Sequence, residues 1–220
     1  IILFFARQVR MAQKDIGHKV PLHTLKTTGE VEAFYDGWAD NGKYNRDMQD
    51  WNYTGPQECV GVLSDYLIDT QASILDAGCG SGLVGEALHE RGYTCIDGVD
   101  LSNKLLDTVP NEIYQTLFQA DLNYSLDVPD SYYDAVICVG TFTYGHVKAD
   151  ALAEFIRITN HEGFICFTVN EGIFVEQGFQ AKLADLETED RWVRRELFKS
   201  DYLASKNVNA WLGLYQVKKC

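Results

Sequence analysis

The sequence predicts an α/β protein with a doubly wound, mostly parallel β-sheet, and three observations carry that prediction. The apolar pair Ile74-Leu75 runs into Asp76, and glycines follow at alternate positions. Strand-like and helix-like stretches then alternate through residues 74–169, which favours parallel strands with helices on both faces of the sheet. The stretch 133–139 is a nearly continuous apolar run, as is typical of a strand buried on both faces.

The segment 29–69 is predicted to form helices that cap the sheet or cover its mouth. A helix is expected from residue 30 to 38, where four apolar side chains recur at helical spacing: Val31, Phe34, Tyr35 and Trp38. Asn41-Gly42 should end this helix. Pro56 suits the first turn of a second helix that ends near Asp69. Because these helices precede the first strand, they lie outside the sheet.

The remaining elements follow the chain in order. After the glycines we expect a helix that begins at Leu83 and stops at Gly92. Strands are predicted at 93–99, 114–120, 133–139 and 163–169, with helices near 102–110, 151–156 and 179–187. The last two strands, 192–199 and 211–217, are separated by too few residues for a helical crossover, so an antiparallel pair is predicted.

Composition limits the classes of function. The chain has 220 residues and is 46% hydrophobic, which suffices for one domain, expected at 29–220. Its formal net charge of -13 disfavours a nucleic-acid substrate, since phosphate binding needs a basic face. A small molecule or a protein partner fits better. Six cysteines without a C-x-x-C pair predict neither a metal site nor a redox motif. We expect reduced cysteines, hence a cytoplasmic or nuclear location, and a monomer.

The first residues are expected to contribute nothing to the fold. The apolar start Ile1–Phe5 is too short to cross a membrane and lacks the features of a signal peptide, so no membrane attachment is expected. The first methionine is Met11. We therefore expect residues 1–28 to be a disordered or non-native leader.

The acid beside the glycine turn indicates which ligand binds there. A dinucleotide fingerprint would place a third glycine where Leu83 stands. Asp76 would repel a pyrophosphate but would attract an ammonium group. S-adenosylmethionine carries an ammonium and a sulfonium and no phosphate. Asp100 follows the second strand and could accept both ribose hydroxyls, whereas Asp121 could accept from the adenine amine, with Leu122 as an apolar wall.

The glycine stretch resembles motif I of the class I S-adenosylmethionine-dependent methyltransferases. Over roughly residues 30–175 the chain is similar to the methyltransferase-like proteins of the Williams-Beuren syndrome critical region. The segments that carry this similarity are Phe34–Asp40, Tyr53–Pro56, Ile74–Gly82, Gly98–Ser102 and Val139–Phe142. The resemblance implies a seven-stranded sheet, S-adenosylmethionine as cofactor and methyltransferase activity. In one departure, Asn45 stands where many relatives have an acid, which affects the expected lid contacts of Tyr44.

The predicted cofactor-binding residues lie at the carboxyl ends of the expected strands. They are Asp76, Ala77, Gly78, Cys79, Gly80, Gly82, Asp100, Leu101, Ser102, Asp121, Leu122, Val139, Gly140 and Thr141. Aromatic residues are expected to form a lid or an acceptor pocket: Tyr35, Trp38, Tyr44, Tyr53, Phe142 and Tyr144. His146 is the candidate general base, with a loop histidine that caps the next helix as the alternative.

Four functions remain open at this point. The leading one is methyl transfer to a small-molecule or protein acceptor, which needs positioning rather than a triad or a metal. The second is a binding module that holds the cofactor and acts through a protein partner without turnover. An NAD-linked oxidoreductase is disfavoured by Asp76 and Leu83. An aminopropyltransferase is disfavoured because its decarboxylated donor would leave Asp76 with less to bind.

Overall fold

The computed structural model describes residues 24–25, 27–144, 147–206 and 208–218. The strands are β1 (Ile74–Ala77), β2 (Ile96–Asp100), β3 (Thr116–Gln119), β4 (Tyr133–Phe142), β5 (Thr159–Asn170), β6 (Trp192–Leu203) and β7 (Val208–Val217). The helices are α2 (Thr28–Ala39), α3 (Lys43–Asp50), α4 (Gly55–Tyr66), α5 (Leu83–Glu90), α6 (Asn103–Leu106), α7 (Ala151–Ile158), α8 (Glu171–Phe174) and α9 (Phe179–Thr188). The described residues also include the 3-10 turns η2 (Asp40–Gly42) and η3 (Ala204–Lys206).

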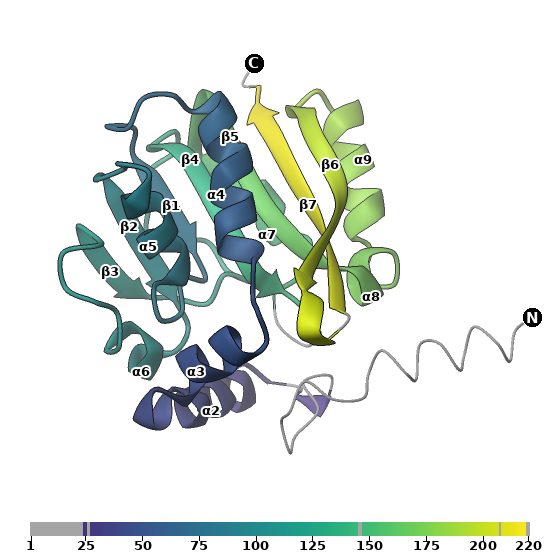
Figure 1. Ribbon diagram of the computed structural model, residues 1–220. Helices are drawn as coiled ribbons and strands as arrows, with labels where there is room; N and C mark the ends of the chain where they lie inside the picture. Colours follow the sequence, from purple (N-terminus) through teal and green to yellow (C-terminus); the bar gives the residue numbers. More distant parts are fainter. Residues whose placement is uncertain (1–23, 26, 145–146, 207, 219–220) are drawn as a thin grey trace, which may run out of the picture.

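The seven strands form one sheet in the order β3-β2-β1-β4-β5-β7-β6 (Figure 1). The pairs among β1 to β5 are parallel. β7 runs antiparallel to both of its neighbours, β5 and β6. The predicted fold class, including the antiparallel C-terminal pair, is therefore confirmed. Strand order reverses between β1 and β4, and ligands of such sheets bind at the carboxyl ends of the strands beside this switch.

Two hydrophobic clusters hold helices against the two faces of the sheet. In β1, Ile74 belongs to the cluster that contains residues of α4 and α5 on one face, while Leu75 belongs to the cluster that contains residues of α7, α8 and α9 on the other. This alternation follows from the two-residue period of a strand. Figure 1 shows α4 in front of the sheet and α7 behind it. Both residues are fully buried, so β1 and its glycine turn are anchored in the centre of the molecule.

The N-terminal helices form a separate layer beyond the carboxyl ends of the strands. α2 begins at Thr28 because Thr27 and Glu30 form a capping box, each side chain accepting a hydrogen bond from the other residue's backbone N–H. Thr28, which was expected in the leader, thus belongs to the first helix of this layer. Asn41 and Gly42, with φ of 56° and 65°, turn the chain into α3. α3 was not predicted, and its one buried residue, Met48, explains why no apolar pattern marked it.

Several element boundaries differ from the predicted ones. β2 begins at Ile96 rather than at residue 93, and α4 ends at Tyr66 rather than near 69. β3 is limited to 116–119, which leaves Tyr114 outside the strand. β4 continues to Phe142 beyond an irregularity at Gly140, whose φ is +77°. Within the described residues, no helix combines the length and the apolarity needed to cross a lipid bilayer.

Candidate functional site

A cavity of about 250 Å³ opens at the carboxyl ends of β1, β2 and β4, under α2 and α3. Nine of the fourteen predicted cofactor residues line it: Gly78, Gly80, Asp100, Leu101, Asp121, Leu122, Val139, Gly140 and Thr141. Other lining residues, which were not predicted, are Thr27, Thr28, Val31, Leu105, Ala120, Asn123, Tyr124, Val147 and Lys148. The cavity therefore lies at the switch point that the fold predicts for a ligand.

The glycine turn forms the floor of this cavity. Gly78, Gly80 and Gly82 all have positive φ, of 83°, 55° and 93°. A Cβ at Gly78 would lie 2.1 Å from Thr141 Oγ1, so a larger residue there would push the ends of β1 and β4 apart. The backbone N–H groups of Gly78 and Cys79 donate to the Val99 carbonyl, at 2.8 and 3.0 Å. Three further predicted residues belong to the turn but do not line the cavity: Ala77, Cys79 and Gly82.

Asp100 lies at the end of β2 and faces the cavity. Its Oδ2 accepts from the Gly80 N–H at 2.8 Å, and its Oδ1 accepts from the Ser102 N–H at 2.8 Å. Burial raises the pKa of Asp100, the three backbone N–H groups of Ser102, Gly80 and Leu101 lower it, and Asp36 raises it. Each carboxylate oxygen of Asp100 keeps a further lone pair. The two oxygens can therefore still accept hydrogen bonds from two hydroxyl groups.

Ser102 has a structural part beside the site rather than a place in the cavity wall. Its hydroxyl caps α6 by accepting from the Leu105 N–H at 3.1 Å. The same hydroxyl donates to Asp36 Oδ1 on α2 at 2.6 Å. Ser102 is fully buried and thus links the end of β2 to the helical layer above it.

Asp121 and Leu122 form one wall, in the loop between β3 and β4. Asp121 Oδ1 accepts from the backbone and side-chain nitrogens of Asn123, both at 2.9 Å. Its Oδ2 accepts from the Thr28 hydroxyl at 2.8 Å. Asp121 therefore already has protein donors on both oxygens, and an adenine amine would have to share Oδ2 with Thr28 or displace it.

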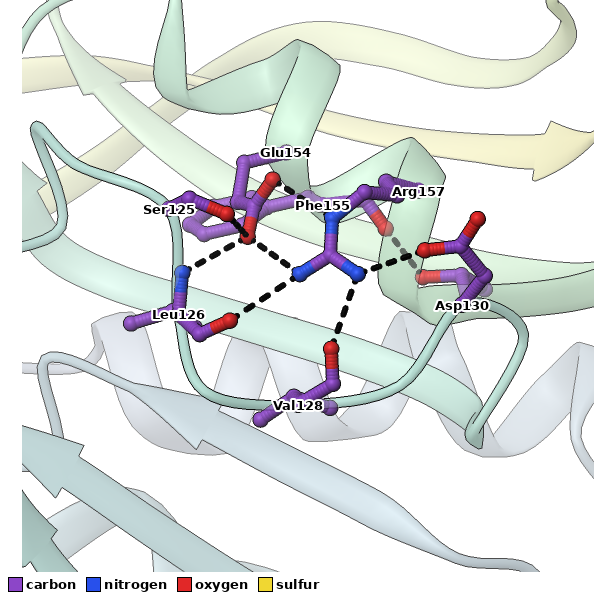
Figure 2. Close-up of polar contacts among 8 residues, drawn as sticks. Ser125, Leu126, Val128, Asp130, Glu154, Phe155 and Arg157 are labelled. Carbon is purple, nitrogen blue, oxygen red and sulfur yellow. Dashed lines mark hydrogen bonds and ion pairs between the residues drawn. The ribbon is translucent and has the colours of Figure 1, made fainter.

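The loop that carries this wall is held from behind by a network between Glu154 and Arg157 of α7 (Figure 2). Arg157 donates to the carbonyls of Leu126 and Val128 at 3.1 and 2.8 Å, and to Asp130 at 2.6 Å. Glu154 bonds Arg157 Nε at 2.9 Å and Nη2 at 2.6 Å. These hydrogen bonds, chiefly the one from Arg157, lower the pKa of Glu154. The network fixes the loop against α7.

Glu154 also reaches the first part of the same loop. Its Oε1 accepts from the Leu126 N–H at 2.8 Å and from the Ser125 hydroxyl at 3.2 Å. Leu126 is buried in the core cluster of this face. Asp121 and Leu122 thus precede a segment that is tied down by several bonds, which keeps the cavity wall in one place.

Asp76 lies behind the glycine turn and does not line the cavity. Its carboxyl group is fully buried, and Oδ2 accepts from the Tyr114 hydroxyl at 2.6 Å. Oδ1 has no hydrogen-bond partner among the described residues. Burial raises the pKa of Asp76 to about 7. The hydrogen bond from Tyr114 and the nearby Gly85 N–H lower this pKa, and the Asp100 charge raises it further.

A row of polar side chains docks the helical layer onto the site. Thr28, Glu32, Asp36 and Asp40 are spaced four residues apart and therefore share one side of α2 and η2. Their partners are Asp121, Gln119, Ser102 and Lys104, at 2.8, 2.9, 2.6 and 3.3 Å. From α3, Asn45 accepts a hydrogen bond from Ser81 in the glycine turn. Asn45, the departure from the family pattern, thus anchors α3 to the turn.

The predicted lid and acceptor residues divide into three groups. Tyr35 and Tyr44 line the cavity. Trp38 and Tyr53 lie in the helical layer: Trp38 packs on Trp51 and bonds Asp47 at 2.8 Å, and Tyr53 packs on Tyr202. Phe142 and Tyr144 lie elsewhere.

Phe142 is buried in the core rather than in a pocket, because its ring packs against Phe155, Phe167 and Phe179. The Tyr144 hydroxyl lies against Gly172 of α8, where a Cβ would come within 2.0 Å of it. His146, the candidate base, is outside the described residues. Within the described ranges no group of three or more metal-ligating side chains occurs.

Two residues near the site were not predicted as site residues, and they differ in whether a sequence pattern indicates them. Thr27-Thr28-Gly29-Glu30 has the capping-box pattern, which would have placed Thr28 at a helix start. Tyr114 gave no such signal, because its apolar surroundings fit the start of a strand. Its contact with Asp76 joins residues 38 positions apart, and local patterns do not report such contacts.

Comparisons with known proteins agree with this geometry. A family model described as a methyltransferase domain matches residues 74–163, from β1 to the start of β5. Methyltransferase-like protein 27 of Homo sapiens is 31% identical over 177 residues, covering 77% of this chain and 71% of the relative. A ubiquinone biosynthesis O-methyltransferase of Nitrosomonas europaea is 26% identical over 117 residues, 50% of this chain and 46% of that protein.

The fold is also shared with solved structures. A Haloferax volcanii putative methyltransferase, solved in complex with the Trm112 methyltransferase activator, has a TM-score of 0.65 and 16% identity, covering 84% of this chain and 98% of the other. At this identity the likeness shows the fold alone. The human relative decides the family, because the identity and the coverage of both chains are high. The chain belongs to the class I S-adenosylmethionine-dependent methyltransferases, in the family of methyltransferase-like protein 27.

Proposed function

We propose that this protein binds S-adenosylmethionine in the cavity and transfers its methyl group to a small-molecule acceptor. The observation that carries the proposal is the convergence of Asp100, Asp121 and the glycine turn on one cavity, with Asp76 directly behind the turn. Carboxylates at three strand ends suit a ligand that carries positive charge and hydroxyl groups. They do not suit a phosphate.

The residues present fit the cofactor at each of its parts. Asp100 has two oxygens that can each accept a ribose hydroxyl beside the backbone N–H already bound. The adenine ring needs an apolar slot, and Val31, Leu105, Leu122 and Val147 line the same cavity. The methionine ammonium needs an acceptor, and the buried Oδ1 of Asp76 lacks a partner among the described side chains and backbone. An unsatisfied buried carboxylate oxygen is costly, which supports a ligand or a water there.

The chain's own residues position the acceptor and exclude water. The cofactor supplies an activated methyl group on its sulfonium, so no nucleophile of the protein is needed. Tyr44, Gly140 and Thr141 line the cavity beside β4, where the acceptor would lie. Burial raises the pKa of Tyr35 and of Tyr44, which keeps both phenols neutral near the cation. We keep His146 as the proposed general base for acceptors that must lose a proton.

The proposal extends to partners and location. A net charge of -13 offers no driving force for phosphate contacts, so nucleic acid is not proposed as the acceptor. A cytoplasmic or nuclear monomer with reduced cysteines remains our proposal. The alternative is a module that holds the cofactor and acts through a protein partner without turnover. The activator bound to the Haloferax volcanii protein is the observation that keeps this alternative in view.

Calorimetry with S-adenosylmethionine, S-adenosylhomocysteine and NAD tests the cofactor. We expect the first two to bind and NAD to fail. Asp100→Asn should weaken the binding of S-adenosylmethionine and of S-adenosylhomocysteine by about 2 kcal/mol, roughly thirtyfold in Kd, because an ionised acceptor is lost. Asp97→Asn is the matched control, since Asp97 lies on the same strand but bonds the Tyr133 hydroxyl outside the cavity. NAD binding with no response to the sulfonium ligand would contradict the proposal.

A screen of acceptor classes with radiolabelled methyl donor separates the enzyme from the binding module. We expect label to pass to a small aromatic or polar molecule, as the lining of the cavity favours. Cofactor binding without transfer to any class, but with transfer on adding a protein partner, would favour the alternative.

A further inference from the structure

Tyr114 lies in a slot made by three glycines. Its ring fills the space between β2 and α5, where a Cβ at Gly98 would lie 3.0 Å from ring Cδ1. A Cβ at Gly85 would lie 2.3 Å from the hydroxyl oxygen, and one at Gly82 would lie 3.5 Å from ring Cε2. The ring can occupy this position because Gly85 and Gly98 carry no side chain. None of these contacts belongs to the cavity wall.

The slot places the Tyr114 hydroxyl between a helix end and the buried carboxyl. The hydroxyl accepts from the Gly85 N–H at 3.1 Å, which satisfies a free donor in the first turn of α5. It donates to Asp76 Oδ2 at 2.6 Å. Because Oδ2 is held in this way, Oδ1 is the carboxylate oxygen left without a partner among the described residues, buried behind the glycine turn.

Few other charges act on Asp76. Asp100 is the ionisable neighbour that raises its pKa. The remaining titratable groups whose pKa responds to Asp76 are Tyr44, Tyr53, Cys79 and Cys138, besides Tyr114 itself. Burial raises the pKa of all five, so they stay neutral. The hydrogen bond from Tyr114 is therefore a specific influence that favours the ionised carboxylate against burial and Asp100.

We propose that Tyr114 is a positioning residue that favours the ionised form of the Asp76 carboxyl and fixes its orientation for the ammonium group of the bound cofactor. It acts on the methionine end alone, because its ring and hydroxyl touch neither the ribose nor the adenine side of the cavity. This inference rests on the proposed binding of S-adenosylmethionine. It adds a residue from outside the glycine motif to the recognition of the ammonium group, which Asp76 would reach through one bridging water because it does not itself line the cavity.

The test compares two ligands across pH by calorimetry on the full chain. S-adenosylmethionine carries the ammonium group, and 5′-methylthioadenosine is an uncharged nucleoside thioether that lacks it. Tyr114→Phe should weaken S-adenosylmethionine about tenfold or more near pH 6.5, since a hydrogen bond to a charged group is lost. The difference in affinity between the wild type and Tyr114→Phe should narrow near about pH 8.5, where the Asp76 carboxyl ionises without the hydrogen bond from Tyr114. Titration of the ligand's own amine is common to both proteins and cancels in their ratio.

The uncharged ligand and a second variant complete the test. Binding of 5′-methylthioadenosine should stay within about twofold of the wild type in Tyr114→Phe, because the nucleoside subsite is unchanged. Gly85→Ala should reproduce the pH-dependent loss, since the new Cβ displaces the phenol. Gly61→Ala is its control: it makes the same change in α4, where the new Cβ meets only Arg91 Nη2, at 3.5 Å.

The outcomes separate this inference from the proposed function. If the wild type binds neither ligand, the proposed function fails, and this inference fails with it. If the wild type binds both and Tyr114→Phe binds S-adenosylmethionine equally well at every pH, only the inference is overturned. An equal loss for both ligands also overturns it, because Tyr114 would then support the whole site structurally.

Discussion

Two of the strand-end acids show how burial and hydrogen bonding set the state of a carboxyl group at residue scale. Asp100 accepts backbone N–H bonds that offset part of the effect of its burial on the pKa. Asp76 receives a side-chain hydroxyl on one oxygen and nothing among the described residues on the other. Its pKa of about 7 means that the group exchanges a proton near neutral pH. Under the proposed function, the same residue type would serve two different parts of one ligand.

Asp76 should also control how stability depends on pH. Its pKa in the folded chain, about 7, is above the unfolded value, so the folded state binds the proton more firmly. The contribution of Asp76 to stability is therefore fully present below about pH 4 and is lost as pH rises through about 7. Asp76→Asn stays neutral and should lack this loss. In the ligand-free protein, the variant's advantage should grow by on the order of 4 kcal/mol between these limits.

Urea unfolding of both proteins across this pH range measures the difference. Other carboxyl groups, such as Glu154 with its lowered pKa, change stability in the opposite direction but equally in both proteins. Asp97→Asn is a control on the neighbouring strand. Parallel stability curves for wild type and Asp76→Asn would mean that Asp76 is already ionised in the folded chain at low pH.

At the scale of elements, the cavity wall depends on a helix that does not itself line the cavity. α7 carries Glu154 and Arg157, and these two side chains hold the loop after β3 by its carbonyls and N–H groups (Figure 2). The side chains of Arg157 and Glu154 are only 28% and 15% exposed, so their bonds are less weakened by water than a surface pair. The loop keeps its course because of this network.

Arg157→Met should therefore destabilise the fold and the adenine wall together. We expect a loss of about 2–3 kcal/mol in the free energy of unfolding, because two partly buried carbonyls and Glu154 lose a charged donor. Affinity for 5′-methylthioadenosine should fall as well, since Asp121 and Leu122 precede the released segment. Denaturant unfolding and calorimetry measure the two effects.

Two variants of the same network serve as controls. Arg157→Lys keeps the charge but cannot donate to both carbonyls at once. Its free energy of unfolding should therefore lie between those of Arg157→Met and the wild type. Asp130→Ala removes the 76% exposed partner and should change stability by less than about 0.5 kcal/mol. If Arg157→Met is as stable as Asp130→Ala, the network does not hold the loop.

What the sequence could predict follows from how local each signal is. The glycine turn, Asp100 and the strand alternation are read over a few neighbouring residues, and each lies where it was expected. Phe142 was assigned to a pocket because it follows the fourth strand, but β4 runs on through Gly140 and turns that side chain into the core. Tyr114 depends on three glycines brought together by the fold. The role of such a residue can be recognised only from the tertiary structure.

At the scale of the whole molecule, stability is divided among three hydrophobic clusters. Two of them cover the faces of the sheet. The third contains Trp38, Met48 and Trp51 of the helical layer, packed on Tyr202, Leu203 and Ala210 at the β6–β7 end. The layer is joined to the residues around the cavity by a row of polar contacts, which water can replace at little cost. We therefore expect the helical layer to open more readily than the sheet unfolds.

Amide hydrogen exchange should show this division directly. Without ligand, amides of α2 and α3 should exchange faster than those of β1, β4 and β5. S-adenosylmethionine at about one hundred times its Kd should slow exchange in α2 and α3 by up to about hundredfold, because the ligand must leave before the layer opens. α9 lies away from the cavity lining and should not respond. Equal protection of α2 with and without ligand would make the layer a fixed cap.

Two variants on the same side of the helical layer locate the contacts that close it. Asp36→Ala breaks the bond to the buried Ser102 and should speed exchange of α2 without ligand. Asp40→Ala breaks only an exposed ion pair with Lys104. The side chains of Asp40 and Lys104 are 59% and 53% exposed, so this variant should hardly change the exchange of α2. If the two variants behave alike, the polar row does not govern closure, and the aromatic cluster around Trp38 holds the layer in both states.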